Sequence, residues 1–232
     1  PPNSLPFRRH VIALITTALV ASAVQAQVWV NKEWVQLTGL PDTLAWSASA
    51  LELGGNVIVV GNTQVTPGDP DVLVTKYSSG GTLLWQQTFE GTGNGPDYGT
   101  AVAIAPSGDI VVAAAVTNTG NNMDMAVLRY SSGGTLLWSS SWNGAGNQID
   151  VPTSIKLHSN AEAYVAGTSY ASAIDLDFAL VKFSYTGSVL WSSYYDYAGL
   201  IDVATGVELD SIGQPIVTGA SAAAIDTWDF AA

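Results

Sequence analysis

The chain has 232 residues, a formal net charge of −12 and no cysteine. The lack of cysteine excludes disulfides, zinc–thiolate sites and cysteine nucleophiles. The acidity disfavours nucleic acids and anionic membrane surfaces as partners, because both repel a negatively charged protein.

An export signal is predicted over residues 1–26. Arg8, Arg9 and His10 form a basic start, residues 11–24 are apolar, and a small-residue cleavage site precedes Gln27. The apolar run is shorter than the ~20 residues that span a membrane. We therefore expect residues 27–232 to be secreted, extracellular or on the cell surface, with the periplasm as a further possibility and without membrane insertion.

The mature part is predicted to be a repeat domain. Segments that begin at Asp71, Asp124 and Asp177 share one pattern, and the spacing between them is 53 residues. Residues 27–38, with Trp29 and Trp34, are expected to form the last strand of an opening partial unit. Self-similarity at this period is typical of units that bury their apolar faces only by stacking on their neighbours.

Each unit reads as four strands. In the second unit, strands are predicted at 100–105, 110–116 and 125–130 and from 135 onward, separated by turns at 106–109 and 131–134 and a loop at 118–122. Four antiparallel strands per unit predict an all-β fold, a β-propeller with about four four-stranded blades. The last unit stops at Ala232, just after its third strand begins, so we expect a truncated domain and an incomplete ring.

The repeated pattern resembles a known family. Asp-x-x-(Val/Leu)-x-(Lys/Arg)-(Tyr/Phe), followed by Gly and Leu-Trp, is similar to the SBBP, or beta-propeller, repeat of exported bacterial proteins. Its second half begins at Asp97, Asp150 and Asp202, and the match covers about residues 42–230. The resemblance implies a secreted or cell-surface propeller, usually one module of a larger protein, without a defined catalytic activity.

A weaker likeness concerns the tryptophan-docking motif of quinoprotein propellers. Residues 182–191 contain the Thr-Gly and the Trp of that motif but lack its Asp. The other copies have Ser-Gly-Gly in place of the Thr-Gly.

The repeated tryptophans Trp85, Trp138 and Trp191 have two interpretations. They could form a ring of indoles that stacks on sugars, but identical recurrence favours packing between blades. Trp46 and Trp142 fall outside the period and are therefore the better candidates for a sugar platform.

The repeated aspartates also have two interpretations. Asp71, Asp124 and Asp177 each follow an oxygen-bearing residue by two positions, and such pairs could bind a hard cation such as calcium. Asp and Asn also cap turns through backbone amides, which is the interpretation that we favour here. The same holds for Asp97, Asp150 and Asp202, which could also rim one opening of a channel. The preceding residues of the first set are Asp69, Asn122 and Asp175.

The basic residues Lys76, Arg129 and Lys182 share the 53-residue step. A ring of cations could bind an anionic ligand, but the acidic surroundings favour ion pairs between blades. Such pairs contribute about 0–1 kcal/mol where they are exposed.

Catalytic chemistry finds little support. Ser169 and Ser221 imitate a nucleophile elbow, yet both are expected at equivalent ends of second strands rather than at a strand-to-helix turn. His158 has no counterpart in the other repeats, and the glycines at 91–95 are expected in a loop between blades. Paired carboxylates could serve a glycosidase, but acidic residues are abundant throughout.

We therefore expect a non-enzymatic interaction or display module with a protein or glycan partner, and without catalytic residues, metal or cofactor. Two alternatives are a carbohydrate-binding or carbohydrate-active propeller, and a quinoprotein-like periplasmic enzyme.

Overall fold

The computed structural model describes residues 45–66, 69–120, 122–172, 175–197, 199–224 and 227–231, and every regular element within these ranges is a β-strand. The expected export signal (1–26) and opening strand (27–38) lie outside the described residues. The fold is therefore all-β, as the sequence predicts.

The strands form antiparallel sheets in which sequence neighbours pair with one another. The first sheet contains β1 (Ala45–Leu51), β2 (Val57–Thr66), β3 (Asp69–Tyr77) and β4 (Leu83–Phe89). The second contains β5 (Tyr98–Ile104), β6 (Ile110–Thr117), β7 (Met123–Tyr130) and β8 (Leu136–Trp142). The third contains β9 (Asp150–Leu157), β10 (Ala163–Ser172), β11 (Asp175–Phe183) and β12 (Val189–Tyr195). The fourth has three described strands, β13 (Asp202–Leu209), β14 (Pro215–Ala224) and β15 (Thr227–Ala231).

The strands predicted in the second unit are confirmed, with shifts of no more than two residues at their starts. All of β6 is buried, as its continuous apolar sequence predicts, whereas most of β8 is exposed. In this sheet the second strand therefore lies inside and the fourth lies outside.

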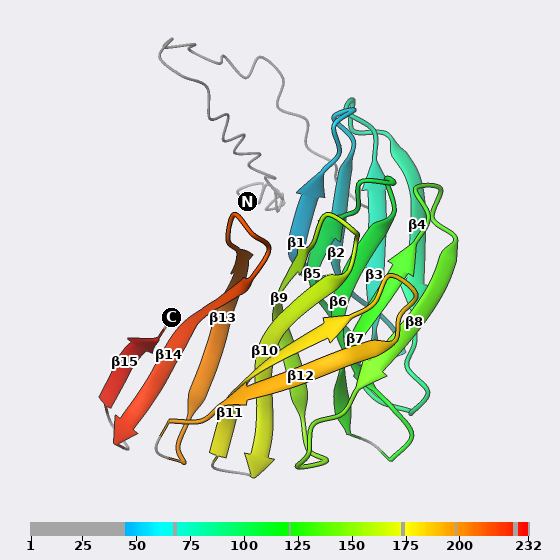
Figure 1. The fold of residues 1–232 in the computed structure, drawn as a ribbon. Coiled ribbons are helices and arrows are strands. Elements are labelled where there is room, and N and C mark those ends of the chain that lie inside the picture. Colours follow the sequence, from blue (N-terminus) through cyan, green and yellow to red (C-terminus); the bar gives the residue numbers. More distant parts are fainter. Residues whose placement is uncertain are drawn as a thin grey trace, which may run out of the picture.

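The sheets follow one another in chain order, with the first strands β1, β5, β9 and β13 in contact in series (Figure 1). Each hydrophobic core lies between two neighbouring sheets. The side chains of β6 divide between two cores, because Val112 packs against the first sheet and Val111 and Ala113 against the third. This stacking fits a propeller-like fold, although the described strands do not close a ring.

The turn between the first two strands of each sheet needs a left-handed residue. Gly55, Gly108 and Gly213 adopt φ of 82°, 86° and 83° there, whereas the third sheet has Ala161 at 62°. A non-glycine residue in this region costs about 1–2 kcal/mol, since its Cβ crowds the backbone.

Replacing Ala161 with glycine should therefore raise the free energy of unfolding by about 0.5–1 kcal/mol, because the relieved strain exceeds the added entropy of the unfolded chain. Chemical denaturation measures this change. The reverse change, Gly108→Ala, should destabilise the protein, and two changes of the same sign would contradict the explanation.

Candidate functional site

Repeated cations occupy the end of the sheets at which β1, β5 and β9 finish. Lys76 pairs with Glu52 at 2.6 Å, Arg129 with Asp109 at 2.9 Å, and Lys182 with Glu162 at 2.6 Å. Each pair joins residues of one sheet. The prediction that these cations form ion pairs between blades is therefore wrong, because the acidic partner is held by a turn of the same sheet.

Two of the three cations reach the next sheet through other contacts. Lys76 Nζ donates to the carbonyl oxygen of Ser132 at 3.0 Å, and Arg129 Nη1 donates to that of Ala161 at 3.5 Å. The Arg129 guanidinium also lies 4.1 Å from the centre of the Tyr185 ring. Arg129 is 1% exposed, so it joins two sheets inside the protein.

Two of the three repeated tryptophans also join neighbouring sheets. Trp85 Nε1 donates to the carbonyl oxygen of Ser132 at 3.2 Å, and Trp138 Nε1 donates to that of Tyr185 at 3.1 Å. The packing interpretation is confirmed for both. Trp191 is 39% exposed and contacts Tyr164 edge-on within its own sheet.

One of the two aperiodic tryptophans, Trp142, is buried rather than presented to solvent as a sugar platform would be. Trp142 is only 9% exposed and belongs to the core between the second and third sheets, where its ring centre lies 5.7 Å from that of Tyr194. The interpretation of Trp142 as a sugar platform is therefore wrong. The side chain of Trp46 lies outside the part of the chain whose side chains are described.

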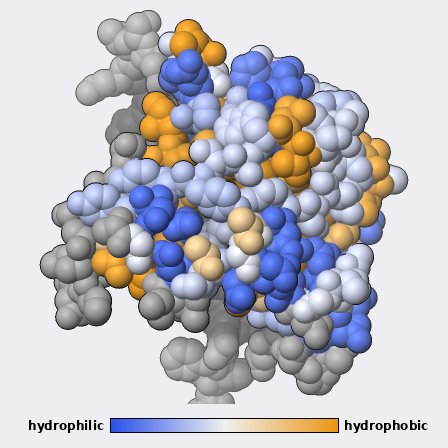
Figure 2. Space-filling model, turned by 60° about the horizontal axis from the view of Figure 1, so that its bottom comes forward, coloured by the Kyte–Doolittle hydropathy of each residue, from blue (hydrophilic) through white to orange (hydrophobic). Residues whose placement is uncertain are grey.

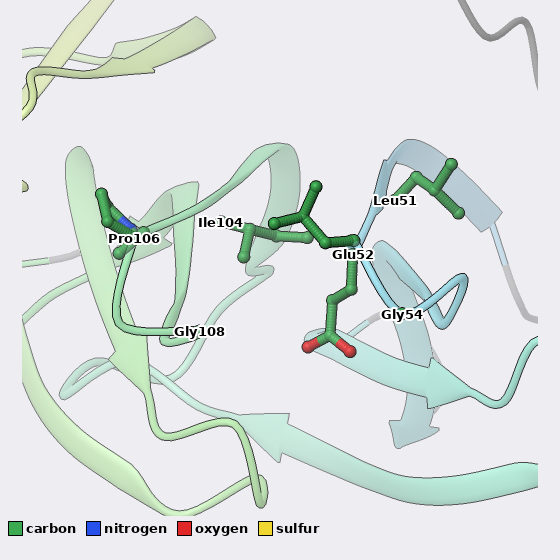
Figure 3. A pocket seen from close by; sticks show the side chains of 8 residues that line it. Leu51, Glu52, Gly54, Ile104, Pro106 and Gly108 are labelled. Atoms are coloured by element: carbon green, nitrogen blue, oxygen red, sulfur yellow. The ribbon is translucent and has the colours of Figure 1, made fainter.

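A pocket of about 480 Å³ opens at the same end as the cations (Figure 3). It lies between the turn after β1 and the turn after β5, and Leu51, Ile104 and Pro106 supply apolar lining. Its charged lining residue, Glu52, is bound to Lys76. The pocket is therefore a mostly apolar hollow between two sheets, with its carboxylate already neutralised.

Buried aspartates fasten the loops that connect one sheet to the next. Asp97 Oδ2 accepts from the Gly91 amide at 2.5 Å, Asp150 Oδ2 from Gly144 at 2.6 Å, and Asp202 Oδ2 from Tyr197 at 2.6 Å. The predicted capping of backbone amides is confirmed at these three positions. All three side chains are almost completely buried.

Asp97 makes a second bond, since its Oδ1 accepts from the Thr117 amide at 2.6 Å. Asp97→Asn should lower the free energy of unfolding by about 1–2 kcal/mol, because the amide NH₂ cannot accept from one of the two backbone donors. Asp210→Asn is the matched control in a denaturation experiment. Asp210 accepts from Ile212 and Gln214 with Oδ1 alone, which Asn retains. Equal losses in the two variants would contradict this role of Asp97.

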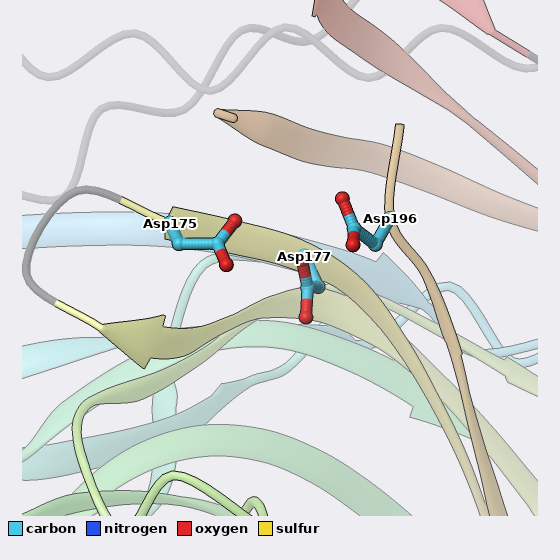
Figure 4. Close-up of side chains that lie close together, drawn as sticks. All are labelled: Asp175, Asp177 and Asp196. Carbon is cyan, nitrogen blue, oxygen red and sulfur yellow. The ribbon is translucent and has the colours of Figure 1, made fainter. Parts of the chain in front are cut away.

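An acidic cluster lies at the opposite end of the third sheet from the cations. Single carboxylate oxygens of Asp175, Asp177 and Asp196 lie within 4.8 Å of one another, and the three side chains converge in Figure 4. Burial, followed by the charges of Asp175, Asp196 and Asp202, raises the pKa of Asp177 to about 6. These residues form the best candidate for a cation site among the described side chains.

The sequence interpretation found part of this cluster and missed the rest. Asp175 and Asp177 were paired by their spacing, but Asp196 belongs to the loop after β12. Its counterparts one and two repeats earlier are Asn143 and Glu90, so all three positions carry side-chain oxygens. Comparing the repeats at that position would have revealed it.

The equivalent aspartates of the other sheets lie in different surroundings. Asp124 is buried, and its Oδ2 accepts from Asn118 Nδ2 at 2.8 Å. Burial, then the charges of Glu90 and Asp69, raises the pKa of Asp71. The capping interpretation therefore does not describe this set as a whole: the contacts differ from sheet to sheet.

The other candidate residues lie where the sequence places them. Ser169 and Ser221 are buried near the ends of β10 and β14, each opposite an aspartate of the first strand of its sheet. His158 lies in an exposed turn, where its Nδ1 is 3.0 Å from Asn160 Oδ1 and 3.3 Å from Ser159 Oγ. Gly91 lies in the loop from β4 to β5.

Comparisons with known proteins support the fold alone. No family model matches the sequence. The regulatory protein FlaEY of Caulobacter vibrioides is 30% identical over 122 residues, which is 47% of this chain but only 12% of that protein.

Two crystal structures of proteins of unknown function are similar in fold. One, from Bacteroides caccae, has a TM-score of 0.52 at 13% sequence identity. The match covers 82% of this chain and 57% of the Bacteroides caccae chain. The other, from Dyadobacter fermentans DSM 18053, has a TM-score of 0.52 at 14% sequence identity. The match covers 80% of this chain and 64% of the Dyadobacter fermentans chain. The chain thus spans less than two thirds of either protein.

Across the described ranges, no helix is both long enough and apolar enough to cross a membrane.

Proposed function

We propose that residues 27–232 belong to a β-propeller of SBBP-type repeats that is exported and serves as a non-catalytic interaction or display module. The 53-residue repeat, the contacts between successive first strands and the basic, then apolar, N-terminal segment support this proposal. The repeated Trp, Arg and Asp side chains hold sheets together, which leaves the outer strands and the loops for contacts with partners.

The observation that carries the proposal is a repeated pair of exposed apolar residues on each outer strand. Six side chains at the 53-residue spacing are 39–49% exposed, two each on β4, β8 and β12: Leu83, Leu84, Leu136, Leu137, Val189 and Leu190. Exposed apolar side chains that recur in register indicate a surface that a partner covers. Figure 2, which views the end where β10 and β14 finish, also shows hydrophobic patches alternating with hydrophilic ones.

The export half of the proposal is tested by treating intact cells that make the full-length tagged protein with a protease. If the protein is on the cell surface, we expect the protease to cleave the tag on intact cells. If the protein is in the periplasm, we expect cleavage only after the outer membrane has been permeabilised. Removal of residues 1–26 should keep the tag in the cytoplasm. Complete protection of the intact protein in both compartments would contradict export.

The interaction half is tested with a photo-crosslinking amino acid at Leu137. We expect discrete crosslinked products on cells that export the protein. The same amino acid at Ser107, in an exposed turn after β5, is the control. Identical product patterns at the two positions would contradict a binding role of the outer strands.

A further inference from the structure

Each of the three junctions between consecutive sheets carries side-chain oxygens at the same four positions. Two positions begin the third strand, one follows the fourth strand, and one begins the next sheet. The three sets are Asp69, Asp71, Glu90 and Asp97; Asn122, Asp124, Asn143 and Asp150; and Asp175, Asp177, Asp196 and Asp202. Only the third set brings three carboxylate oxygens within 4.8 Å of one another in the described chain.

The topology explains why the third set converges. Asp175 and Asp177 are two residues apart at the start of β11, so their side chains share one face. Phe178 pairs with Tyr195 in the ladder between β11 and β12, which places Asp196 beside Asp177. Figure 4 shows the Asp196 carboxylate reaching toward Asp175 and Asp177 from the loop that leaves β12.

A fourth carboxylate approaches from the buried side. Leu176 forms an isolated parallel bridge with Ile201, which brings the fully buried Asp202 next to the start of β11. Oδ2 of Asp202 is bound to the Tyr197 amide, but its buried Oδ1 accepts no hydrogen bond. Its charge contributes to the raised pKa of Asp177, so these two carboxylates lie close enough to repel each other.

Among the described contacts of this cluster no cation balances its charge, although the Gly199 amide donates to Asp196 Oδ1 at 2.8 Å. The buried Oδ1 atoms of Asp175 and Asp177 also lack hydrogen-bond partners. None of the four ion pairs between described residues includes any of these aspartates. Buried oxygens without hydrogen-bond partners beside other carboxylates favour the binding of a cation, because an unpaired buried carboxylate is costly.

We propose that Asp175, Asp177 and Asp196 bind a hard divalent cation, Ca²⁺, and that Asp202 adds a fourth negative charge from the buried side. An all-oxygen donor set without histidine or cysteine suits calcium, which accepts irregular geometry and fills remaining positions with carbonyl groups and water. The ion would join β11, the loop after β12 and the start of β13, and so fasten the third sheet to the fourth. This proposal does not depend on the proposed interaction role.

Calcium binding can be measured on the full chain by calorimetry and by Tb³⁺ luminescence. Tyr195 and Tyr197 flank Asp196 and should sensitise Tb³⁺ emission, which Ca²⁺ should then quench in competition. We expect a Kd on the order of 10⁻⁴–10⁻³ M, the range of extracellular calcium modules, and a rise in Tm of several degrees in about 10 mM Ca²⁺.

Two variants separate binding from folding. Asp177→Asn and Asp196→Asn should each weaken Ca²⁺ binding by at least about tenfold, because each removes a charged ligand. Both should raise Tm without calcium, since they relieve repulsion between carboxylates. Glu208→Gln, which makes the same charge change at an exposed position of β13, is the control and should leave binding unchanged.

The proposal would be overturned if Ca²⁺ left the Tm of the wild-type protein unchanged and Tb³⁺ showed no sensitised emission. Binding that persists at wild-type affinity in both Asp variants would also overturn it. The proposal would be overturned as well if Glu208→Gln weakened Ca²⁺ binding as much as Asp177→Asn and Asp196→Asn do.

Discussion

Arg129→Met should lower the free energy of unfolding by about 3–5 kcal/mol, as expected when one partner of a buried ion pair is removed. Arg129 donates to Asp109 through both Nε and Nη2, and its Nη1 reaches Ala161 of the next sheet. Methionine replaces the volume but leaves the Asp109 carboxylate, which is 16% exposed, without its cation. Urea denaturation monitored by tryptophan fluorescence gives the change.

Lys156→Met is the matched control for this experiment. Lys156 pairs with Glu208 at 2.6 Å and joins the third sheet to the fourth, but its side chain is 42% exposed and that of Glu208 is 71% exposed. Solvent screening limits the expected loss to at most about 1 kcal/mol. Equal losses for the Arg129 and Lys156 variants would show that burial does not determine the contribution of these cations.

Gly187→Ala should cost about 2–5 kcal/mol for two separable reasons. The residue has a φ of 93°, which costs a non-glycine residue about 1–2 kcal/mol. A Cβ at this position would also lie 2.8 Å from Cε3 of Trp138, which belongs to the preceding sheet. Forcing an additional methyl group against a packed indole adds about 1–3 kcal/mol.

Gly108→Ala isolates the first of these costs. Gly108 has a φ of 86°, but the nearest atom to its added Cβ is Cβ of Ser132 at 3.7 Å, an ordinary contact distance. We expect Gly108→Ala to cost only about 1–2 kcal/mol in the same denaturation assay. A loss as large as that of Gly187→Ala would mean that packing against Trp138 contributes nothing.

The fold could be predicted because one pattern recurs at a constant spacing. The alternation of apolar runs and Gly-containing turns places β5–β8 to within two residues at their starts. The recurrence of Trp85 and Trp138 also predicts packing between sheets, because an invariant position in stacked units faces the neighbouring unit.

Pair partners could not be predicted in the same way. Recurrence of Lys76, Arg129 and Lys182 shows that a cation is needed there, but not whether its acidic partner belongs to its own sheet or the next. The acid of the first sheet, Glu52, also occupies a different place in the repeat from Asp109. The conformation of the turn determines which acid lies within reach of the cation, and the repeat pattern alone does not reveal that conformation.

Aperiodic residues were the least predictable. At the position of Trp142 the other repeats carry Phe89 and Tyr195 rather than tryptophan, and this change of residue type suggested an exposed, functional indole. In the structure, it fills a space beside Tyr194 of the next sheet and is buried. The change from Phe or Tyr to Trp thus reflects local packing here, because each inter-sheet core is filled by a slightly different set of side chains.

The central claim is that repeated residues fasten each sheet to the next, and a double-mutant cycle between Trp138 and Gly187 tests it most directly. The cycle compares the cost of Gly187→Ala in the wild type with its cost in a Trp138→Leu background. If the indole packs on the neighbouring hairpin, the cost in that background should fall to that of Gly108→Ala, with a coupling energy of at least about 1 kcal/mol. An identical cost in both backgrounds would show that the two sheets are not joined through this contact.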